Sequence, residues 1–294
     1  MDLRKKNRIK TIQSSLAIEN NSLTVEQITA IIEGKRVFGN PREIKEVTNA
    51  LEAYELLLQL NPYKEEDILK AHQLMMQELV GQSGQYRKSG VGVFNGKDVV
   101  HLAPPADRVP FLMEDLFCWL KNSDIHLLIK SSVFHYEFEF IHPFEDGNGR
   151  MGRLWQTVIL KEWKEIFAWL PVETLIKENQ AKYYDVLRIS DKNGDSTKFI
   201  EFMLEMLLRA IEKHISNDTV KVTVNGTVKV TVNDTVKMII ALIKENPEIS
   251  YEELAKRTGK SRVTVSRKIA ELKKKGIIRR VGADKNGYWE LVDE

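Results

Sequence analysis

The segment 142–153 combines side chains suited to chemistry with glycines that leave room for a ligand. It reads HPFEDGNGRMGR. His142 titrates near neutral pH and can act as a general base, while Asp146 can hold Mg²⁺ through one carboxylate if phosphates and waters supply the other ligands. Gly147 and Gly149 permit positive φ and let several backbone N–H groups point at one anion. The segment therefore predicts a site for a magnesium-bound phosphate beside a base.

Two arginines complete the segment. Arg150 and Arg153 stand three residues apart, so in a helix both guanidinium groups can reach the same ligand. A plainer interpretation makes His142 and Asp146 a hydrogen-bonded pair at a helix end and the glycines an ordinary turn. The concentration of chemically suited residue types in one segment favours the phosphate site.

The flanking sequence predicts the two helices that must hold this segment. An apolar run over 134–141 ends at Pro143, whose ring disfavours helix behind it. Its partial alternation also fits a strand, and we interpret it as a helix that stops at His142. A second helix is expected to start near Gly149, because apolar residues then recur with helical spacing. These are Met151, Leu154, Trp155, Val158 and Ile159.

The segment resembles the signature of the Fic family, HPFxDGNGRxxR, at every specified position. The resemblance covers most of the first two-thirds of the chain. It implies a mainly α-helical enzyme that moves AMP from Mg·ATP onto a Ser, Thr or Tyr hydroxyl of a target protein and releases pyrophosphate. It also implies that His142 deprotonates that hydroxyl and that Asp146 holds the metal. The residues expected at the phosphates are Gly147, Asn148, Gly149, Arg150 and Arg153.

A second resemblance lies near the N-terminus. Residues 15–20 read SLAIEN and resemble the family's inhibitory pattern [S/T]xxxE[G/N], in which a helix glutamate pairs with the second arginine of the signature. The resemblance implies that Glu19 binds Arg153 and lowers basal activity. A carboxylate–arginine pair is strong enough to compete with a phosphate for the guanidinium. The alternative is an exposed helix glutamate with no such role.

Two further regions are expected near the site. Residues 84–88 together with 91–102 alternate β-branched residues around turn glycines and predict a short hairpin, which in the family is a flap that binds the target segment as an added strand. A purely structural hairpin is the alternative. Tyr183 and Tyr184 fall where relatives place residues around the adenosine, although aromatic pairs on helices also serve as core. Asp191 stands where some relatives carry asparagine.

Composition indicates an ordinary globular protein. The chain has 294 residues, 43% of them apolar and 29% charged, so it can form a sizeable core. It shows no signal-peptide pattern and no uninterrupted apolar stretch long enough to span a bilayer, and we expect a cytoplasmic protein without a membrane partner. Cys118 is the single cysteine. We expect it to be a buried thiol in a helix of a reducing compartment.

An eight-residue repeat marks the clearest domain boundary. The sequence NDTVKVTV at 217–224 recurs as NGTVKVTV at 225–232 and begins again at Asn233. Alternating valines predict a β-ribbon, and the valines share one face only if the loop has an odd number of residues, for instance with Gly226 in a bulge. Such a ribbon could pair with another copy of the chain, which leaves a homo-oligomer open. A flexible tether is the alternative.

The C-terminal part resembles a winged helix-turn-helix domain. A helix over 238–243, a capped start at Ser250, a turn at Gly259 and a third helix from Ser261 precede two strands around 284–287. Residues 251–285 hold twelve basic and four acidic side chains, a net charge of +8, whereas the whole chain carries +2. This charge favours duplex DNA as a partner, and a basic face on a protein-binding winged helix is the alternative.

The sequence thus predicts a mainly α protein with four parts. They are an N-terminal segment with the inhibitory helix (1–40), a Fic-type catalytic domain with a small hairpin flap (41–216), a β-ribbon linker (217–233) and a winged helix-turn-helix domain (234–294). Its expected function is protein adenylylation with ATP and Mg²⁺. Alternatives are a DNA-binding regulator that only senses nucleotide, or an enzyme that transfers UMP, phosphate or phosphocholine or removes AMP. Sensing alone would not need the base His142.

Overall fold

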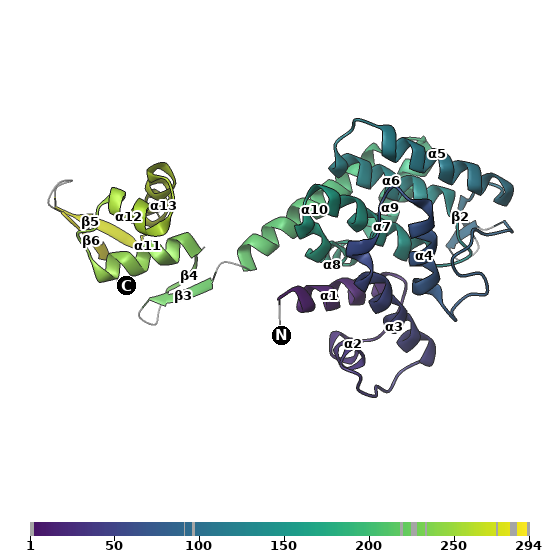
Figure 1. Ribbon diagram of the computed structural model, residues 1–294, viewed down its shortest axis with the longest axis horizontal. Helices are drawn as coiled ribbons and strands as arrows, with labels where there is room; N and C mark the ends of the chain where they lie inside the picture. The colour runs from purple at the N-terminus through teal and green to yellow at the C-terminus, as the bar shows by residue number, and fades with distance from the viewer. Residues whose placement is uncertain are drawn as a thin grey trace. The chain divides into compact units, whose positions relative to one another are not determined.

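The computed structural model describes residues 3–90, 92–95, 98–217, 220–224, 228–232, 234–274, 276–282 and 287–292 (Figure 1). The chain divides into two compact units, 1–211 and 212–294. Among the described residues, no helix is both long and apolar enough to cross a bilayer. The predicted mainly helical fold, with a small hairpin in the first part and a winged helix at the end, is confirmed.

Two helices form the centre of the first unit, α6 (Leu127–Ile141) and α7 (Asn148–Trp163) (Figure 1). Their bounds confirm the two helices predicted around the signature, with α7 beginning one residue before Gly149. The surrounding helices are α1 (Leu3–Ile18), α2 (Val25–Ile32), α3 (Pro41–Glu55), α4 (Glu65–Met76), α5 (Val109–Asn122), α8 (Val172–Glu178), α9 (Gln180–Asn193) and α10 (Thr197–Asn217). The 3₁₀ turns are η1 (Leu57–Gln59), η2 (Ala106–Arg108) and η3 (Glu165–Trp169).

Helix α1 contributes to both hydrophobic clusters of this unit. Ile12 and Leu16 are buried in the cluster that also contains Trp155, whereas Ile18 is buried in the cluster around Tyr183. Burying such a side chain stabilises the fold by about 1.5–3 kcal/mol relative to leaving it exposed. The N-terminal helix is therefore an integral part of the core of the first unit.

The expected burial of Cys118 is wrong, because its thiol is exposed. The buried face of α5 follows Met113, Leu116, Phe117 and Leu120, the helical spacing i, i+3, i+4, i+7. Cys118 lies off this stripe.

A hairpin occupies the predicted flap. Strands β1 (Gly92–Asn95) and β2 (Asp98–Leu102) pair antiparallel, with a register shift between Val93 and Phe94. Val91, Gly96 and Lys97 lie outside the described residues. The structure thus confirms the hairpin for the second part of the predicted region, whereas 84–88 form turns and irregular chain and no strand. The role of the hairpin in target binding stays a prediction.

The repeat forms a second hairpin. Strands β3 (Val220–Val224) and β4 (Val228–Val232) pair antiparallel with Val220 opposite Val232 and Val222 opposite Val230. Valines therefore face valines, as predicted for an odd-length loop, here residues 225–227. Gly226 itself lies outside the described residues.

The remainder of the second unit is a small winged helix. Its elements are α11 (Asp234–Glu245), α12 (Tyr251–Thr258), α13 (Arg262–Lys274), β5 (Ile278–Val281) and β6 (Tyr288–Leu291). Ser250 caps α12 as predicted, because its hydroxyl accepts the N–H of Glu253 at 3.1 Å. Val265, Ile269 and Leu272 on α13 share a core with Trp289. The predicted turn at Asp284–Asn286 lies outside the described residues.

Candidate active site

His142 occupies the point where α6 ends. It adopts a left-handed conformation with φ 52° and ψ 59°, which turns the chain sharply out of the helix. Its Nδ1 donates to the carbonyl of Glu139 at 3.3 Å, so Nε2 is the basic nitrogen of the neutral ring. The backbone carbonyl of His142 accepts a hydrogen bond from Nε of Arg87 at 2.7 Å. The imidazole is therefore held in the tautomer that a general base needs.

The Arg87 side chain fastens the signature to another part of the chain. It is 3% exposed and donates to the carbonyls of Ser89 at 2.9 Å and Pro104 at 2.6 Å as well as to His142. Burial lowers the pKa of Arg87. One guanidinium thus ties the end of α6 to the segments on both sides of the flap.

His72 performs a similar task on the other side of the turn. Its ring stacks on Phe144 with centroids 3.6 Å apart, its Nδ1 accepts the N–H of Gly84 at 2.8 Å and its Nε2 donates to the Asp146 carbonyl at 3.0 Å. Burial lowers the pKa of His72 to about 4. A neutral ring, donating through one nitrogen and accepting through the other, therefore holds the turn. Sequence reasoning missed both Arg87 and His72, because no local pattern links them to residues more than 50 positions away.

Asn148 shapes the turn through its side chain. Its Oδ1 accepts the N–H of Phe144 and its Nδ2 donates to the Phe144 carbonyl, both at 2.9 Å. Gly147 adopts a positive φ of 87° and caps α7. Both atoms of the Asn148 amide are engaged in this closure. A phosphate contact from Asn148 would therefore come from its backbone N–H.

Asp146 is surrounded by cationic and N–H donors. Its Oδ1 accepts the N–H of Gly147 at 2.6 Å and Nη2 of Arg150 at 3.1 Å, and its Oδ2 lies 3.5 Å from Nη2 of Arg42. Arg150 also lies 3.7 Å from Glu46. Arg150, expected at the phosphates, is thus paired with the predicted metal ligand.

This environment fits a metal bound mainly through its substrate. Among the residues that the structure describes, no group of three or more His, Cys, Asp or Glu side chains could hold a metal. A single, 44% exposed carboxylate at Asp146 suits Mg²⁺, which is commonly bound by one carboxylate together with phosphates and waters.

Buried Arg153 is paired with a glutamate that directly follows the N-terminal helix. Its Nη2 donates to Oε1 of Glu19 at 2.7 Å and to the carbonyl of Ser15 at 3.1 Å, and its Nε donates to the Ser15 hydroxyl at 3.2 Å. Burial alone would lower the pKa of Arg153, but the charge of Glu19 outweighs it and raises that pKa. The pair implied by the resemblance is therefore formed in the structure.

The Glu19 carboxylate lies on the first turn of α7. A Cβ at Gly149 would overlap Oε1 of Glu19 and would lie 3.0 Å from Nη1 of Arg153. Unpaired N–H groups and the helix dipole make this turn favourable for an anion. The missing side chain of Gly149 thus leaves a cradle for a negatively charged group, and Glu19 occupies it.

Side chains from α8 and α9 hold the end of α1. Lys177 donates to the Ala17 carbonyl at 2.6 Å, and Gln180 donates to the Ile18 carbonyl at 2.9 Å. These carbonyls belong to the last turn of α1, which has no intrahelical partners for them. Lys177 also places a positive charge where the helix dipole favours one.

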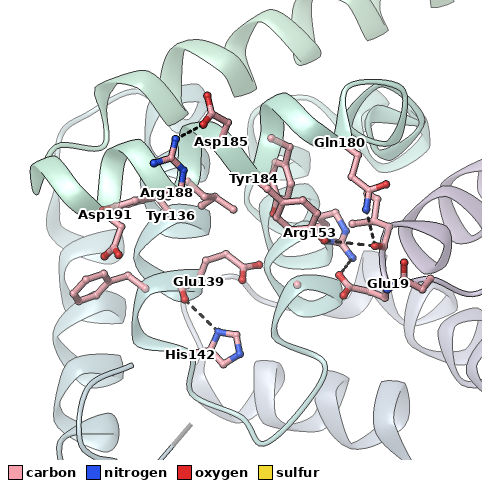
Figure 2. A pocket seen from close by; sticks show the side chains of 16 residues that line it. Glu19, Tyr136, Glu139, His142, Arg153, Gln180, Tyr184, Asp185, Arg188 and Asp191 are labelled. Carbon is pink, nitrogen blue, oxygen red and sulfur yellow. Dashed lines mark hydrogen bonds and ion pairs between the residues drawn. The ribbon is translucent and has the colours of Figure 1, made fainter. Parts of the chain in front are cut away.

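A cavity of about 700 Å³ opens beside His142 and the Glu19–Arg153 pair (Figure 2). It brings together six of the predicted site residues, Glu19, His142, Gly149, Arg153, Tyr183 and Tyr184. Asp146, Gly147, Asn148 and Arg150 do not line it. Further lining residues that sequence reasoning missed include Glu139 and Arg188, and the latter donates to Asp185 at 2.6 Å.

The two tyrosines contribute differently. Tyr183 is 1% exposed, and its hydroxyl lies 3.1 Å from Nε2 of His135, whose Nδ1 donates to Gln156 at 2.8 Å. Burial raises the pKa of Tyr183 well above its usual value. Tyr184 is 45% exposed. Tyr183 therefore serves as core that also forms part of the cavity wall, whereas Tyr184 is available to a ligand.

Comparison with known families matches both units. The Fic/DOC family model matches residues 62–160, and a winged helix-turn-helix DNA-binding model matches residues 232–279. A crystal structure of a Fic family protein from Desulfovibrio desulfuricans G20 is 47% identical, with 99% of this chain and 88% of that chain covered and a TM-score of 0.71.

Curated relatives resemble part of the chain. The protein adenylyltransferase Fic of Aedes aegypti is 26% identical over 70% of this chain and 42% of its own length. A probable protein adenylyltransferase of Aquifex aeolicus is 34% identical over 50% of this chain and 46% of its own length. The chain thus spans less than half the length of these relatives. Fic-1 of C. elegans, 23% identical with a TM-score of 0.59 over 71% of this chain and 62% of that chain, shares the fold.

Proposed function

The chain belongs to the Fic/DOC family, and from this membership we propose that its first unit transfers AMP from Mg·ATP to a Ser, Thr or Tyr hydroxyl of a target protein in the cytoplasm. One observation carries the proposal. The complete signature surrounds an anion cradle at Gly149, and His142 beside it is held with Nε2 as its basic nitrogen. An alcohol and a phosphate placed there would meet a base and a helix N-terminus together.

The residues of the signature have separate tasks in this reaction. Nε2 of His142 takes the proton of the target hydroxyl, whose oxygen then bonds to the α-phosphorus while the bond to the pyrophosphate oxygen breaks. Gly147, Asn148 and Gly149 offer backbone N–H groups to the phosphates, and Arg150 and Arg153 bind the β- and γ-phosphates. Asp146 would hold Mg²⁺, which neutralises phosphate charge when bound.

We further propose that Glu19 keeps this activity low. Its carboxylate fills the Gly149 cradle and accepts from Arg153, so a γ-phosphate would have to displace it from both. The end of α1 is anchored by Lys177 and Gln180, which makes that displacement costly. Basal transfer is therefore expected to be slow.

Labelling with radioactive ATP tests both proposals. Glu19→Gly should raise labelling of the protein or of a lysate target from α-labelled ATP, and adding His142→Ala should abolish it. γ-labelled ATP should give no label, since the β- and γ-phosphates leave as pyrophosphate. Equal labelling of wild type and Glu19→Gly would contradict inhibition by Glu19. Label from γ-labelled ATP would instead indicate phosphate transfer, and release of AMP from a labelled target would indicate removal.

A second candidate function concerns residues 234–294, which we propose bind duplex DNA. Arg262, Val263 and Arg267 on α13 are exposed, and α13 is the helix that enters the major groove in this fold. The +8 charge of 251–285 suits a phosphate backbone. The full chain should bind a random duplex pool with an affinity that falls steeply with salt. Binding that ignores salt would favour a protein partner.

A further inference from the structure

Glu139 is an acidic residue at the cavity that the signature does not contain. It lies in the last turn of α6, three residues before His142, and its backbone carbonyl accepts a hydrogen bond from Nδ1 of His142 at 3.3 Å. Both residues line the cavity, and the Glu139 side chain is 14% exposed. Figure 2 shows the Glu139 side chain above the His142 ring, extending toward the side of the cavity where Arg153 and Glu19 lie.

One oxygen of the Glu139 carboxylate is buried without a hydrogen bond in the described part of the chain. Its Oε1 is buried 3.7 Å from Nε2 of His135 and has no hydrogen-bond partner among the described residues. A Cβ at Gly152 would come within 2.9 Å of this oxygen, so the glycine makes room for it. A buried carboxylate oxygen without a partner is uncommon and calls for a role.

Glu139 is ionised despite its burial. Burial would raise the pKa of Glu139, but the neighbouring His135, His142 and Arg153 outweigh that effect and lower it. A negative charge therefore persists in a poorly solvated position where a positive charge on His142 would be felt. Attraction between charges is several-fold stronger there than in bulk water.

Other charged groups face the cavity from neighbouring elements. Glu19, directly after α1, and Arg153 of α7 pair with each other, as do Asp185 and Arg188 of α9. Asp191 of α9 also lines the cavity, and Arg87 donates to the His142 carbonyl. Within these pairs the opposite charges largely offset one another. Glu139 differs because it belongs to the turn that carries the base, and its own backbone carbonyl accepts the hydrogen bond from Nδ1 of His142.

We propose that Glu139 is a positioning residue that stabilises the protonated form of His142 during AMP transfer. Its backbone carbonyl orients the ring through Nδ1, and its carboxylate offsets the charge that forms when Nε2 accepts the proton of the target hydroxyl. Glu139 takes no proton itself. The hydroxyl oxygen forms its bond to phosphorus, and pyrophosphate departs with the electrons of the broken bond. This inference rests on the proposed function in that His142 is the base.

Titration of His142 in the nucleotide-free full chain tests the proposal without any catalysis. The imidazole C–H signal is assigned by its loss in His142→Gln and followed by NMR against pH. Removing a nearby carboxylate destabilises the imidazolium, so Glu139→Gln should lower the pKa of His142 by about one unit. Glu139→Asp keeps the negative charge, so the pKa of His142 in this variant should stay close to its wild-type value. An unchanged His142 pKa in Glu139→Gln would overturn the proposal.

Glu137→Gln is the matched control. It changes the same residue type on the same helix, two positions earlier, and Glu137 does not line the cavity. It should leave the His142 pKa in place. A shift of the same size in this variant would mean that helix charge in general, and not Glu139, is responsible, and would overturn the assignment.

The pH dependence of AMP transfer gives a second readout in a Glu19→Gly background. Because His142 becomes a weaker base in Glu139→Gln, the acid limb of the kcat profile should move to lower pH by about one unit, and the plateau of kcat should fall several-fold. KM for ATP should change little. An unmoved acid limb would overturn the proposal. If Glu19→Gly transfers no AMP at all, the proposed function fails, and the NMR titration still decides whether Glu139 acts on His142.

Discussion

The two signature arginines lie three residues apart on α7 but meet different surroundings. Arg150 pairs with Asp146, a 44% exposed carboxylate four residues away in the sequence. Arg153 pairs with Glu19, which is 134 positions away and reaches it through the buried end of α1. Both guanidinium groups are buried, Arg150 being 4% and Arg153 2% exposed, so the two pairs differ in their carboxylates. Asp146 belongs to the same turn and is 44% exposed, whereas Glu19 is held in place by the docking of an entire helix. The proposed control of the site therefore belongs to the Arg153 side.

The largest effect is expected from filling the cradle on the Arg153 side. In a Glu19→Gly background, Gly149→Ala should lower AMP transfer roughly a hundredfold, because the new methyl group occupies the space where a carboxylate or phosphate must lie. Initial rates with α-labelled ATP measure this. Gly81→Ala is the control, since nothing lies within 4 Å of its added Cβ. Nearly full activity of Gly149→Ala would place the phosphates elsewhere.

Glu173 is a second acidic residue near Arg153, and it tests whether the surroundings of Arg153 tolerate another ionised carboxylate. Glu173 is 2% exposed, accepts the Tyr54 hydroxyl at 3.2 Å and lies beside Thr174, which bonds to Ser14 of α1. Burial raises the pKa of Glu173 to about 7. The folded protein therefore favours the neutral carboxyl of Glu173. The contribution of this group to the free energy of unfolding is fully present below pH 4.5 and is lost as pH rises through 7.

Glu173→Gln should therefore stabilise the protein at pH 8 by about 2 kcal/mol and have little effect at pH 4.5. Denaturant unfolding at the two pH values measures the difference. The same gain at both pH values would show that the ionisation of Glu173 is not the cause.

A smaller effect should follow from loosening the end of α1. Lys177→Met removes the donor to the Ala17 carbonyl and should raise basal AMP transfer three- to tenfold, because about 1 kcal/mol of helix anchoring is lost. Lys182→Met, which breaks an exposed pair between α9 and Glu205 of α10 and touches no carbonyl of α1, should not raise it. In Glu19→Gly the Lys177 change should add nothing. An additive increase there would mean that Lys177 acts independently of the inhibitory pair.

The smallest effect is expected around Asp146, whose carboxylate is 44% exposed. Arg42→Gln removes a partner 3.5 Å from Asp146 and should change the Mg²⁺ concentration for half-maximal transfer by less than about twofold. A tenfold change would show that Arg42 of α3 competes with Mg²⁺ for the Asp146 carboxylate. AMP transfer would then be controlled at Asp146 as well as at Arg153.

Local patterns predicted much of the fold. The ends of α6 and α7 follow from Pro143 and from the spacing of the apolar residues after Gly149. The Ser250 cap and the pairing of valines in the repeat could also be predicted, because each depends only on residues a few positions apart in the sequence. The prediction for Cys118 failed because an apolar run was treated as wholly buried, although its helical spacing leaves Cys118 outside.

The sequence by itself determined which segment could bind a phosphate and which residue could act as the base, since these depend on residue type and short spacing. Only the tertiary structure decided that His72 and Arg87 hold the turn and that Asn148 closes it through its side chain. It alone brought Glu139 and Arg188 to one cavity. Such contacts join segments tens of residues apart, and their geometry depends on how whole helices pack, which no short pattern in the chain specifies.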